Sequence, residues 1–165
     1  PGDYALTFTA DDGLLKSSKT VNVSVKAAAG AVPADYCHFG GGTLDVSKGK
    51  LNITKSDKDT LAIGEDGFLG PFANDGDSVT WQVNAPWDGK FALHVKFNGK
   101  WGSKKNSFIV NGGTPVSIEF PQTDEKGQTM IVPVMLRAGD NTISFGKFSG
   151  DWGYMFIKSI EVTAE

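Results

Sequence analysis

Two of the four tryptophans, Trp101 and Trp152, lie in segments rich in glycine and polar residues. A flat aromatic ring in such a segment can cover the apolar C–H face of a pyranose with a large contact area and a small loss of rotamer entropy. We therefore interpret Trp101 and Trp152 as a stacking platform for a saccharide. The alternative is that both rings fold down onto the end of the domain as structural plugs.

Polar side chains near these tryptophans could orient a sugar through hydrogen bonds to its hydroxyl groups. The candidates are Asn98, Lys104, Asn106 and Asp151. Each of them could instead be a solvated surface residue. Two further aromatic residues flank the same segments. Phe72 either contacts the ligand or packs under its own loop, and Tyr154 either lines the cleft or caps the core.

The acidic residues of these segments do not indicate catalysis. Glycosidases need two carboxyl groups about 5–10 Å apart across a cleft, whereas most of the acids here occur in turn or capping contexts, where carboxylates bind the backbone. They are Asp75, Asp77, Asp124, Glu125 and Asp151. Cys37 and His38 are sequence neighbours that would point in opposite directions in a strand, so they make a poor nucleophile–base pair. One cysteine and two histidines cannot form a standard structural zinc site. We expect no enzymatic activity and no cofactor.

Alternating apolar residues predict the strands that hold these side chains. The alternation is clearest in Asp77–Asn84 and Lys90–Phe97. Further short strands are expected at Thr43–Val46, Lys50–Thr54, Leu61–Ile63, Ser107–Val110, Pro115–Phe120, Thr129–Leu136, Asn141–Phe145 and Tyr154–Thr163. The series predicts an all-β fold of two antiparallel sheets, either a β-sandwich or a jelly roll.

The lengths of the connections place the tryptophans. Short, turn-like connections are Ala85–Gly89, Asn111–Thr114 and Arg137–Asp140, and longer ones are Phe68–Gly76, Asn98–Asn106, Pro121–Gln128 and Lys147–Gly153. If successive strands run in opposite directions, the connections alternate between the two ends of the sandwich. The long loops, with Trp101 and Trp152, then gather at one end. Trp81 is expected in the core, and Trp87 is expected to pack over strand ends at the opposite end.

The net charge and the lengths of the apolar runs limit the classes of partner that the protein can bind. The formal net charge is −3 and the pI is about 5.4, which argues against broad electrostatic binding to nucleic acid or anionic lipid. No apolar run is long enough to span a membrane. We expect a monomer that binds neither nucleic acid nor a membrane.

The domain organisation predicted from these patterns has three parts. Residues 1–26 form a hairpin, interpreted as the truncated end of a preceding immunoglobulin-like domain. Residues 27–34 are a linker of small residues. Residues 35–165 form the sandwich. Linked modules are common in extracellular enzymes, and by this association we expect a secreted protein.

From Gly76 to Thr163 the order of strand and turn phrases resembles that of family 35 carbohydrate-binding modules. These phrases are Gly76–Trp81, Ala85-Pro86, Phe108–Gly112, Val116–Pro121, Leu136–Ile143, Gly153-Tyr154 and Ile157–Val162. The resemblance implies a jelly-roll sandwich with a glycan site at the loop apex. It also implies attachment to a glycoside hydrolase that acts on plant cell-wall polysaccharide. Within the family, the likeness is to the mannan-binding module of a bacterial β-mannanase.

The same resemblance implies a structural calcium, held in part by an acidic residue of the final strand. The matching position here is Lys158. Calcium needs several oxygen ligands, often carboxylates, so this lysine argues against the calcium site. Gln122–Gln128, which matches a loop that often carries a tryptophan in relatives, has no aromatic residue. The stacking role therefore falls to Trp101 and Trp152.

The function expected from these observations is non-catalytic binding of a plant cell-wall polysaccharide, most closely β-mannan, which targets an attached glycoside hydrolase to its substrate. The alternative is a structural or adhesive spacer domain of a multi-domain surface protein. Burial of both loop indoles would favour the spacer.

Overall fold

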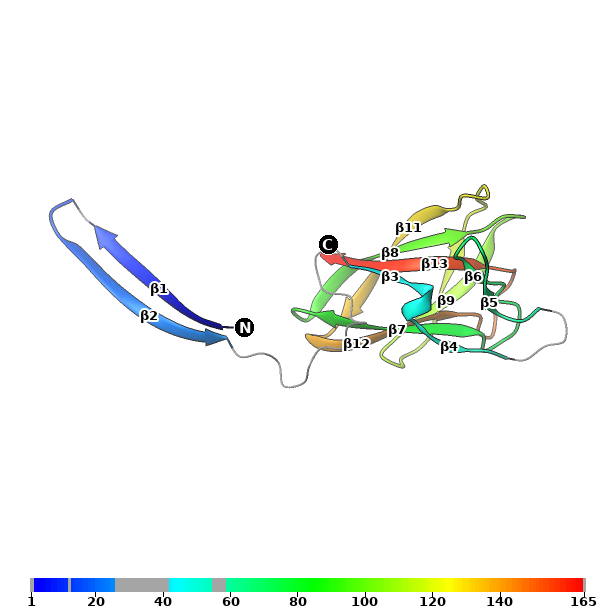
Figure 1. Cartoon of the computed structure of the whole chain (residues 1–165), viewed down its shortest axis with the longest axis horizontal. Coiled ribbons are helices and arrows are strands. Elements are labelled where there is room, and N and C mark those ends of the chain that lie inside the picture. Colours follow the sequence, from blue (N-terminus) through cyan, green and yellow to red (C-terminus); the bar gives the residue numbers. More distant parts are fainter. Residues whose placement is uncertain (1, 12, 26–41, 55–58, 165) are drawn as a thin grey trace. The chain divides into compact units, whose positions relative to one another are not determined.

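A computed structural model describes residues 2–11, 13–25, 42–54 and 59–164 of the chain. The chain divides into two compact units, Pro1–Pro33 and Ala34–Glu165, and each is described separately (Figure 1). The predicted linker at 27–34 and the Cys37-His38 pair lie outside the described residues. Among the described residues there is no helix long and apolar enough to cross a membrane.

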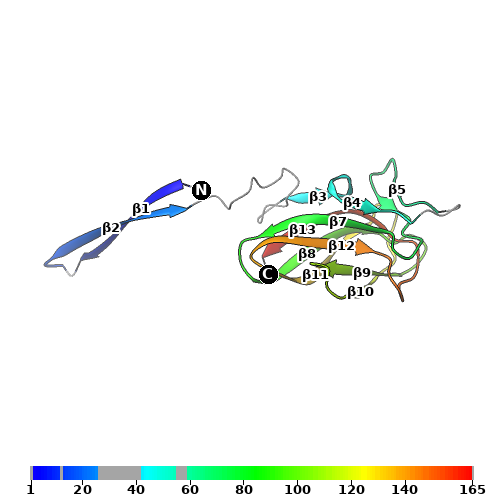
Figure 2. The same cartoon turned by 90° about the horizontal axis from the view of Figure 1, so that it is seen from below.

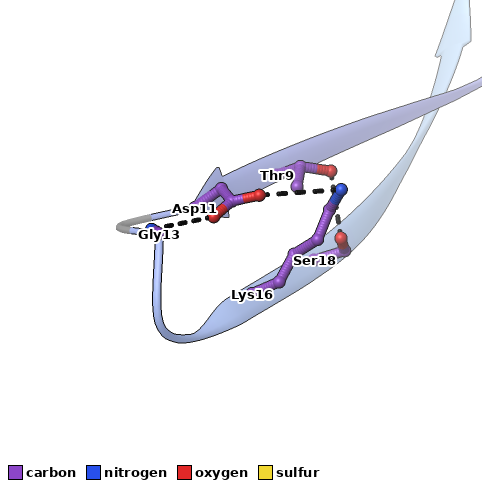
Figure 3. A network of polar contacts seen from close by, with 5 residues as sticks. All are labelled: Thr9, Asp11, Gly13, Lys16 and Ser18. Atoms are coloured by element: carbon purple, nitrogen blue, oxygen red, sulfur yellow. Dashed lines mark hydrogen bonds and ion pairs between the residues drawn. The ribbon is translucent and has the colours of Figure 1, made fainter.

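The first unit is the predicted hairpin of β1 (Gly2–Asp11) and β2 (Lys16–Val25). Tyr4 pairs with Val23 and Leu6 with Val21, so these apolar side chains share one face. Polar contacts close the hairpin (Figure 3). The Asp11 carboxylate accepts a hydrogen bond from the Gly13 amide at 3.0 Å and lies 3.8 Å from the Lys16 ammonium. The hairpin is confirmed, and its origin in an immunoglobulin-like domain stays a prediction.

The second unit is a sandwich of short and medium strands, as predicted. Its elements are β3 (Thr43–Asp45), a 3-10 turn η1 (Val46–Lys48), β4 (Lys50–Asn52), β5 (Ala62–Ile63), β6 (Leu69–Gly70), β7 (Ser78–Ala85), β8 (Gly89–Asn98), β9 (Lys104–Val110), β10 (Val116–Phe120), β11 (Gln128–Leu136), β12 (Gly139–Gly146) and β13 (Phe156–Ala164). The main difference from the sequence-based expectation is at β9, which begins at Lys104 rather than at Ser107.

The strands form two antiparallel sheets. One sheet has the order β10-β9-β12-β7-β4, and the other has the order β11-β8-β13-β6-β5, with β3 also paired to β13. Figures 1 and 2 show β7 and β12 in one layer and β8 and β13 in the other. The predicted all-β jelly-roll sandwich is confirmed.

The core fills the space between the sheets with aromatic and branched side chains. Trp81 is fully buried, as predicted, and its indole N–H donates to the Asp45 carbonyl at 3.1 Å. Phe72 is fully buried and contacts Phe145 edge-on, with ring centroids 5.0 Å apart. Burial of each large apolar side chain contributes roughly 1.5–3 kcal/mol to stability. This rigid core supports the loops at both ends.

The ends of the sandwich differ as the connection lengths predicted. At the short-turn end, the Asp88 carboxylate accepts from the Ala138 amide at 2.7 Å, which ties two of the turns together. Trp87 also lies at this end and stacks on Phe91, with ring centroids 5.7 Å apart. At the long-loop end, the Gly76 amide donates to the Lys147 carbonyl at 2.8 Å, which joins two of the long connections.

Candidate functional site

Two neighbouring loops form the centre of the long-loop end. β9 lies beside β12 in one sheet, and β8 lies beside β13 in the other. The β8–β9 connection (residues 99–103) and the β12–β13 connection (residues 147–155) therefore cross between the sheets side by side. Trp152 of the second connection is joined to Lys105, at the start of β9, by two backbone hydrogen bonds of 2.9 Å. The topology thus brings the two predicted loop tryptophans onto adjacent segments.

Trp101 is the most exposed of the four tryptophans, with 70% of its surface accessible. Its φ is +72°, a left-handed conformation that is rare for a bulky residue. The Lys100 ammonium lies 4.7 Å from the centroid of the Trp101 ring. Phe156 contacts the same ring edge-on at 6.2 Å. The fold therefore holds this indole in solvent in a strained conformation, a feature that clusters at binding sites.

Trp152 and Tyr154 are the exposed aromatic residues of the second loop. Their exposed fractions are 45% and 47%. Trp152 is fixed through its backbone bridge to Lys105, and the Tyr154 hydroxyl lies 3.5 Å from the Asp59 carboxylate. Trp101, Trp152 and Tyr154 are the exposed aromatic residues of the two loops, and we call these three residues the aromatic platform. Burial of both indoles, the condition that would favour a spacer, is not found.

Lys104 connects the two loops from beneath. Its side chain is buried, and its ammonium donates to the carbonyls of Gly102 at 2.6 Å and Ser103 at 3.3 Å. Its aliphatic stem lies against Gly153, where an added methyl group would collide with it. Burial lowers the pKa of the Lys104 ammonium below its ordinary value. Lys104 therefore supports both loops from within the sandwich, and its direct contact with a sugar stays a prediction.

The other polar candidates are also buried and bonded within the protein. Asn98 donates to the Glu125 carbonyl at 2.9 Å and accepts from the Lys100 amide at 2.9 Å. Asn106 donates to the Gly146 carbonyl at 3.1 Å. The Asp151 carboxylate accepts hydrogen bonds from the hydroxyls of Ser107 and Ser117 and from the Phe148 amide.

These contacts shape the loops, and direct sugar contact by Asn98, Asn106 or Asp151 stays a prediction. The alternative stated for Phe72 holds: its ring is fully buried under its own loop and cannot reach a ligand.

A groove of about 470 Å³ adjoins the aromatic platform. Its floor includes Phe156 and Phe68, and its rim includes Ile63, Glu65, Asp66 and Lys100. We call it the Phe156 groove. Sequence reasoning missed it because its lining comes from separate segments that only the sheet pairing β5–β6–β13–β8 brings together. The one sequence feature that indicates the groove is Phe156. It precedes the buried Ile157, so the alternation of side chains in a strand turns the Phe156 ring outward.

The residues around Lys158 do not fit a calcium site. The Lys158 ammonium donates to the Asp66 carbonyl at 2.9 Å and lies 5.3 Å from the centroid of the Phe68 ring. A positive charge at this point repels a metal cation. Among the residues that the structure describes, no group of three or more acidic, histidine or cysteine side chains is placed to hold a metal ion.

Comparison with known proteins agrees with the fold. The sequence model for "Carbohydrate binding module (family 35)" matches residues 43–165. Mannan endo-1,4-beta-mannosidase A of Piromyces sp. is 30% identical over 118 residues, which are 72% of this chain and 19% of that protein. Mannan endo-1,4-beta-mannosidase B of the same organism is 29% identical over 119 residues, 72% of this chain and 20% of that protein. The chain therefore spans about a fifth of the length of these relatives.

Solved structures share the fold. A family 35 carbohydrate binding module from Clostridium thermocellum has a TM-score of 0.61 and 22% identity, with 74% of this chain and 98% of that one covered. The Podospora anserina GH26-CBM35 β-(1,4)-mannanase has a TM-score of 0.58 and 23% identity, with 75% of this chain and 27% of that one covered. The expected likeness to a mannanase module is confirmed.

Proposed function

Because the chain belongs to carbohydrate-binding module family 35, we propose that it binds a plant cell-wall polysaccharide, with β-mannan as the main ligand, and does not catalyse a reaction. The observation that carries the proposal is the pair of exposed indoles, Trp101 and Trp152, on two loops at the same end of the sandwich, with Trp152 hydrogen-bonded through its backbone to Lys105 at the start of β9. The platform has the flat apolar faces that stack on pyranose rings. A few stacked sugars give micromolar to millimolar dissociation constants, about −4 to −8 kcal/mol.

The loop carboxylates support a binding role rather than catalysis. Asp77 is fully buried and accepts hydrogen bonds from the Thr54 amide at 2.8 Å and the Asn74 amide at 3.0 Å. Asp151 likewise accepts a hydrogen bond from a backbone amide, that of Phe148. Asp124 accepts a hydrogen bond from the Lys126 amide at 3.0 Å. Carboxylates engaged in turns are poorly placed to act as the acid and the nucleophile of a glycosidase.

Targeting is the biological role that we propose for this binding. The curated relatives are named as mannanases, and the match covers only about a fifth of their length. A module of this kind holds an attached glycoside hydrolase close to its insoluble substrate, and it acts outside the cell, where that substrate is. Binding through the module raises the effective concentration of substrate at the attached catalytic domain.

Affinity electrophoresis tests the proposal directly. The parent protein is run in gels that contain galactomannan, glucomannan, xylan or pectin, and we expect retardation by the mannan-type polymers. Trp101→Ala and Trp152→Ala should each lose most of this retardation while far-UV circular dichroism stays unchanged. Trp87→Ala, at the short-turn end, is the matched control and should migrate as the parent does. Absence of retardation in every gel would overturn the proposal.

A further inference from the structure

We propose that the Phe156 groove is a second sugar subsite, which receives a single-pyranose side branch while the main glycan chain lies on the aromatic platform. The inference rests on the proposed function and extends it, since it names a neutral, branched glycan as the preferred ligand. The groove volume of about 470 Å³ lies within the range of roughly 300–1,000 Å³ found for small-molecule sites.

The floor of the groove is built for a flat ring. Gly70 lies under Phe156, and any side chain there would collide with the Phe156 ring and come within 2.8 Å of the Met155 carbonyl. The absence of a side chain at Gly70 therefore lets the Phe156 ring lie close to strand β6. Phe68 adds a second apolar surface beside it. A pyranose placed here would find an aromatic face of the kind that the platform offers.

The groove adjoins Trp101 of the platform, and the two ring surfaces are inclined to one another. The rings of Trp101 and Phe156 are 6.2 Å apart between centroids, and their planes make an angle of 67°. Two sugars stacked on these two rings would be inclined by a similar angle. A β-1,4-linked chain is extended and ribbon-like, so consecutive units do not make such a bend easily. A side branch leaves the main chain at an angle, so it can stack on Phe156 while the main chain stacks on Trp101.

The charges at the rim favour a neutral sugar with many hydroxyl groups. The Lys100 ammonium lies 4.7 Å from the Trp101 centroid and 5.8 Å from the Phe156 centroid, at the junction of the two surfaces. Glu65 and Asp66 line the opposite rim with exposed side chains. Ammonium donors and carboxylate acceptors together can bind hydroxyl groups from both sides. Because the ammonium groups of Lys100 and Lys158 balance these two carboxylates, the groove has no net charge that would attract an ionised sugar.

The test compares two probes with the same main chain: an unsubstituted β-1,4-manno-oligosaccharide and the same oligosaccharide with one α-galactosyl branch. Isothermal titration calorimetry gives the two affinities. For the parent protein we expect the branched probe to bind about tenfold more tightly, because a second ring surface is covered. ¹H–¹⁵N NMR should show shifts at the amides of residues 62–66 with the branched probe only.

A groove-filling variant and a matched control separate the subsite from the platform. Ala62→Trp places a large side chain at an exposed position that lines the groove. It should abolish the preference for the branched probe and leave the affinity for the linear probe within about twofold. Ala138→Trp, an equally exposed alanine at the short-turn end, should keep the preference.

The outcomes distinguish the two proposals. Equal affinity of the parent for the two probes, or a preference that survives Ala62→Trp, would overturn the branch subsite and leave the proposed function standing. If neither probe binds, both the proposed function and the subsite fail.

Discussion

The aliphatic stem of Lys104 lies directly against the backbone of Gly153, at a point where a methyl group on Gly153 would collide with the Lys104 side chain. Because the Lys104 ammonium bonds to the carbonyls of Gly102 and Ser103, this one buried side chain touches both tryptophan-bearing loops. Lys104 thus supports both tryptophan-bearing loops from beneath.

Gly153→Ala should disturb this support. Gly153 has φ +86°, so alanine adds backbone strain of about 1–3 kcal/mol, and the new methyl group also displaces Lys104. We expect a drop of several degrees in the melting temperature and weaker retardation in mannan gels. Gly150→Ala is the matched control, since Gly150 has φ +90° but open space around it. Equal effects of the two substitutions on glycan binding would contradict the role given to Lys104.

The lowered pKa of Lys104 predicts a pH dependence of stability. The unfolded chain binds the lysine proton more tightly than the folded protein does, so the free energy of unfolding rises with pH between the lowered pKa and the ordinary value of about 10.4. Lys104→Met removes this contribution. The melting temperature of the parent relative to Lys104→Met should therefore increase from pH 8 to pH 10.5. A constant difference across this interval would show that Lys104 does not titrate there.

The loops of Trp101 and Trp152 show which parts of the candidate site could be predicted from the sequence. The alternation of short and long connections predicts the segments of Trp101 and Trp152 at the same end of the sandwich, where the structure has them, because antiparallel strands return the chain to the same end at every second connection. The burial of Lys104 and Asn106 could not be predicted from the loop pattern, because β9 begins at Lys104 and not at Ser107. Phe108 faces the core, and in a strand the residues two and four before it, Asn106 and Lys104, face the same way.

The Phe156 groove could not be predicted from the sequence. Its rim at Glu65 and Asp66 and its floor at Phe156 are about ninety residues apart in sequence and meet only through the pairing of β6 with β13. Strand pairing between distant segments has no local sequence signal, since it depends on how the two sheets bury their apolar faces.

Trp81→Phe should lower stability without affecting the glycan site. The substitution removes the indole N–H bond to the Asp45 carbonyl and leaves a small cavity in the core. Together these effects cost roughly 2–4 kcal/mol of the free energy of unfolding. Urea denaturation measures that loss, and mannan-gel retardation at low temperature should remain that of the parent. Lost retardation in a folded variant would show that the core and the platform are coupled.

The sandwich should fold and bind without the hairpin. The chain separates into units at Pro33 and Ala34, and the described core of the sandwich is built from its own strands. We expect a protein of residues 34–165 to keep the melting temperature and the mannan-gel retardation of the full chain. A melting temperature lower by more than a few degrees would mean that the first 33 residues stabilise the sandwich.

Lys158 predicts how the sandwich responds to calcium. Its ammonium donates a hydrogen bond to the Asp66 carbonyl at 2.9 Å and lies over the Phe68 ring. These two contacts of the charged group connect the 64–68 turn to β13. Lys158→Met should lower the free energy of unfolding by about 1–2 kcal/mol, because a charge-assisted hydrogen bond and a cation–π contact are lost. Lys158→Arg should recover much of this loss. The melting temperature of the parent should be the same in millimolar calcium and in chelator. A rise on adding calcium would show that the turn binds a metal ion despite the lysine.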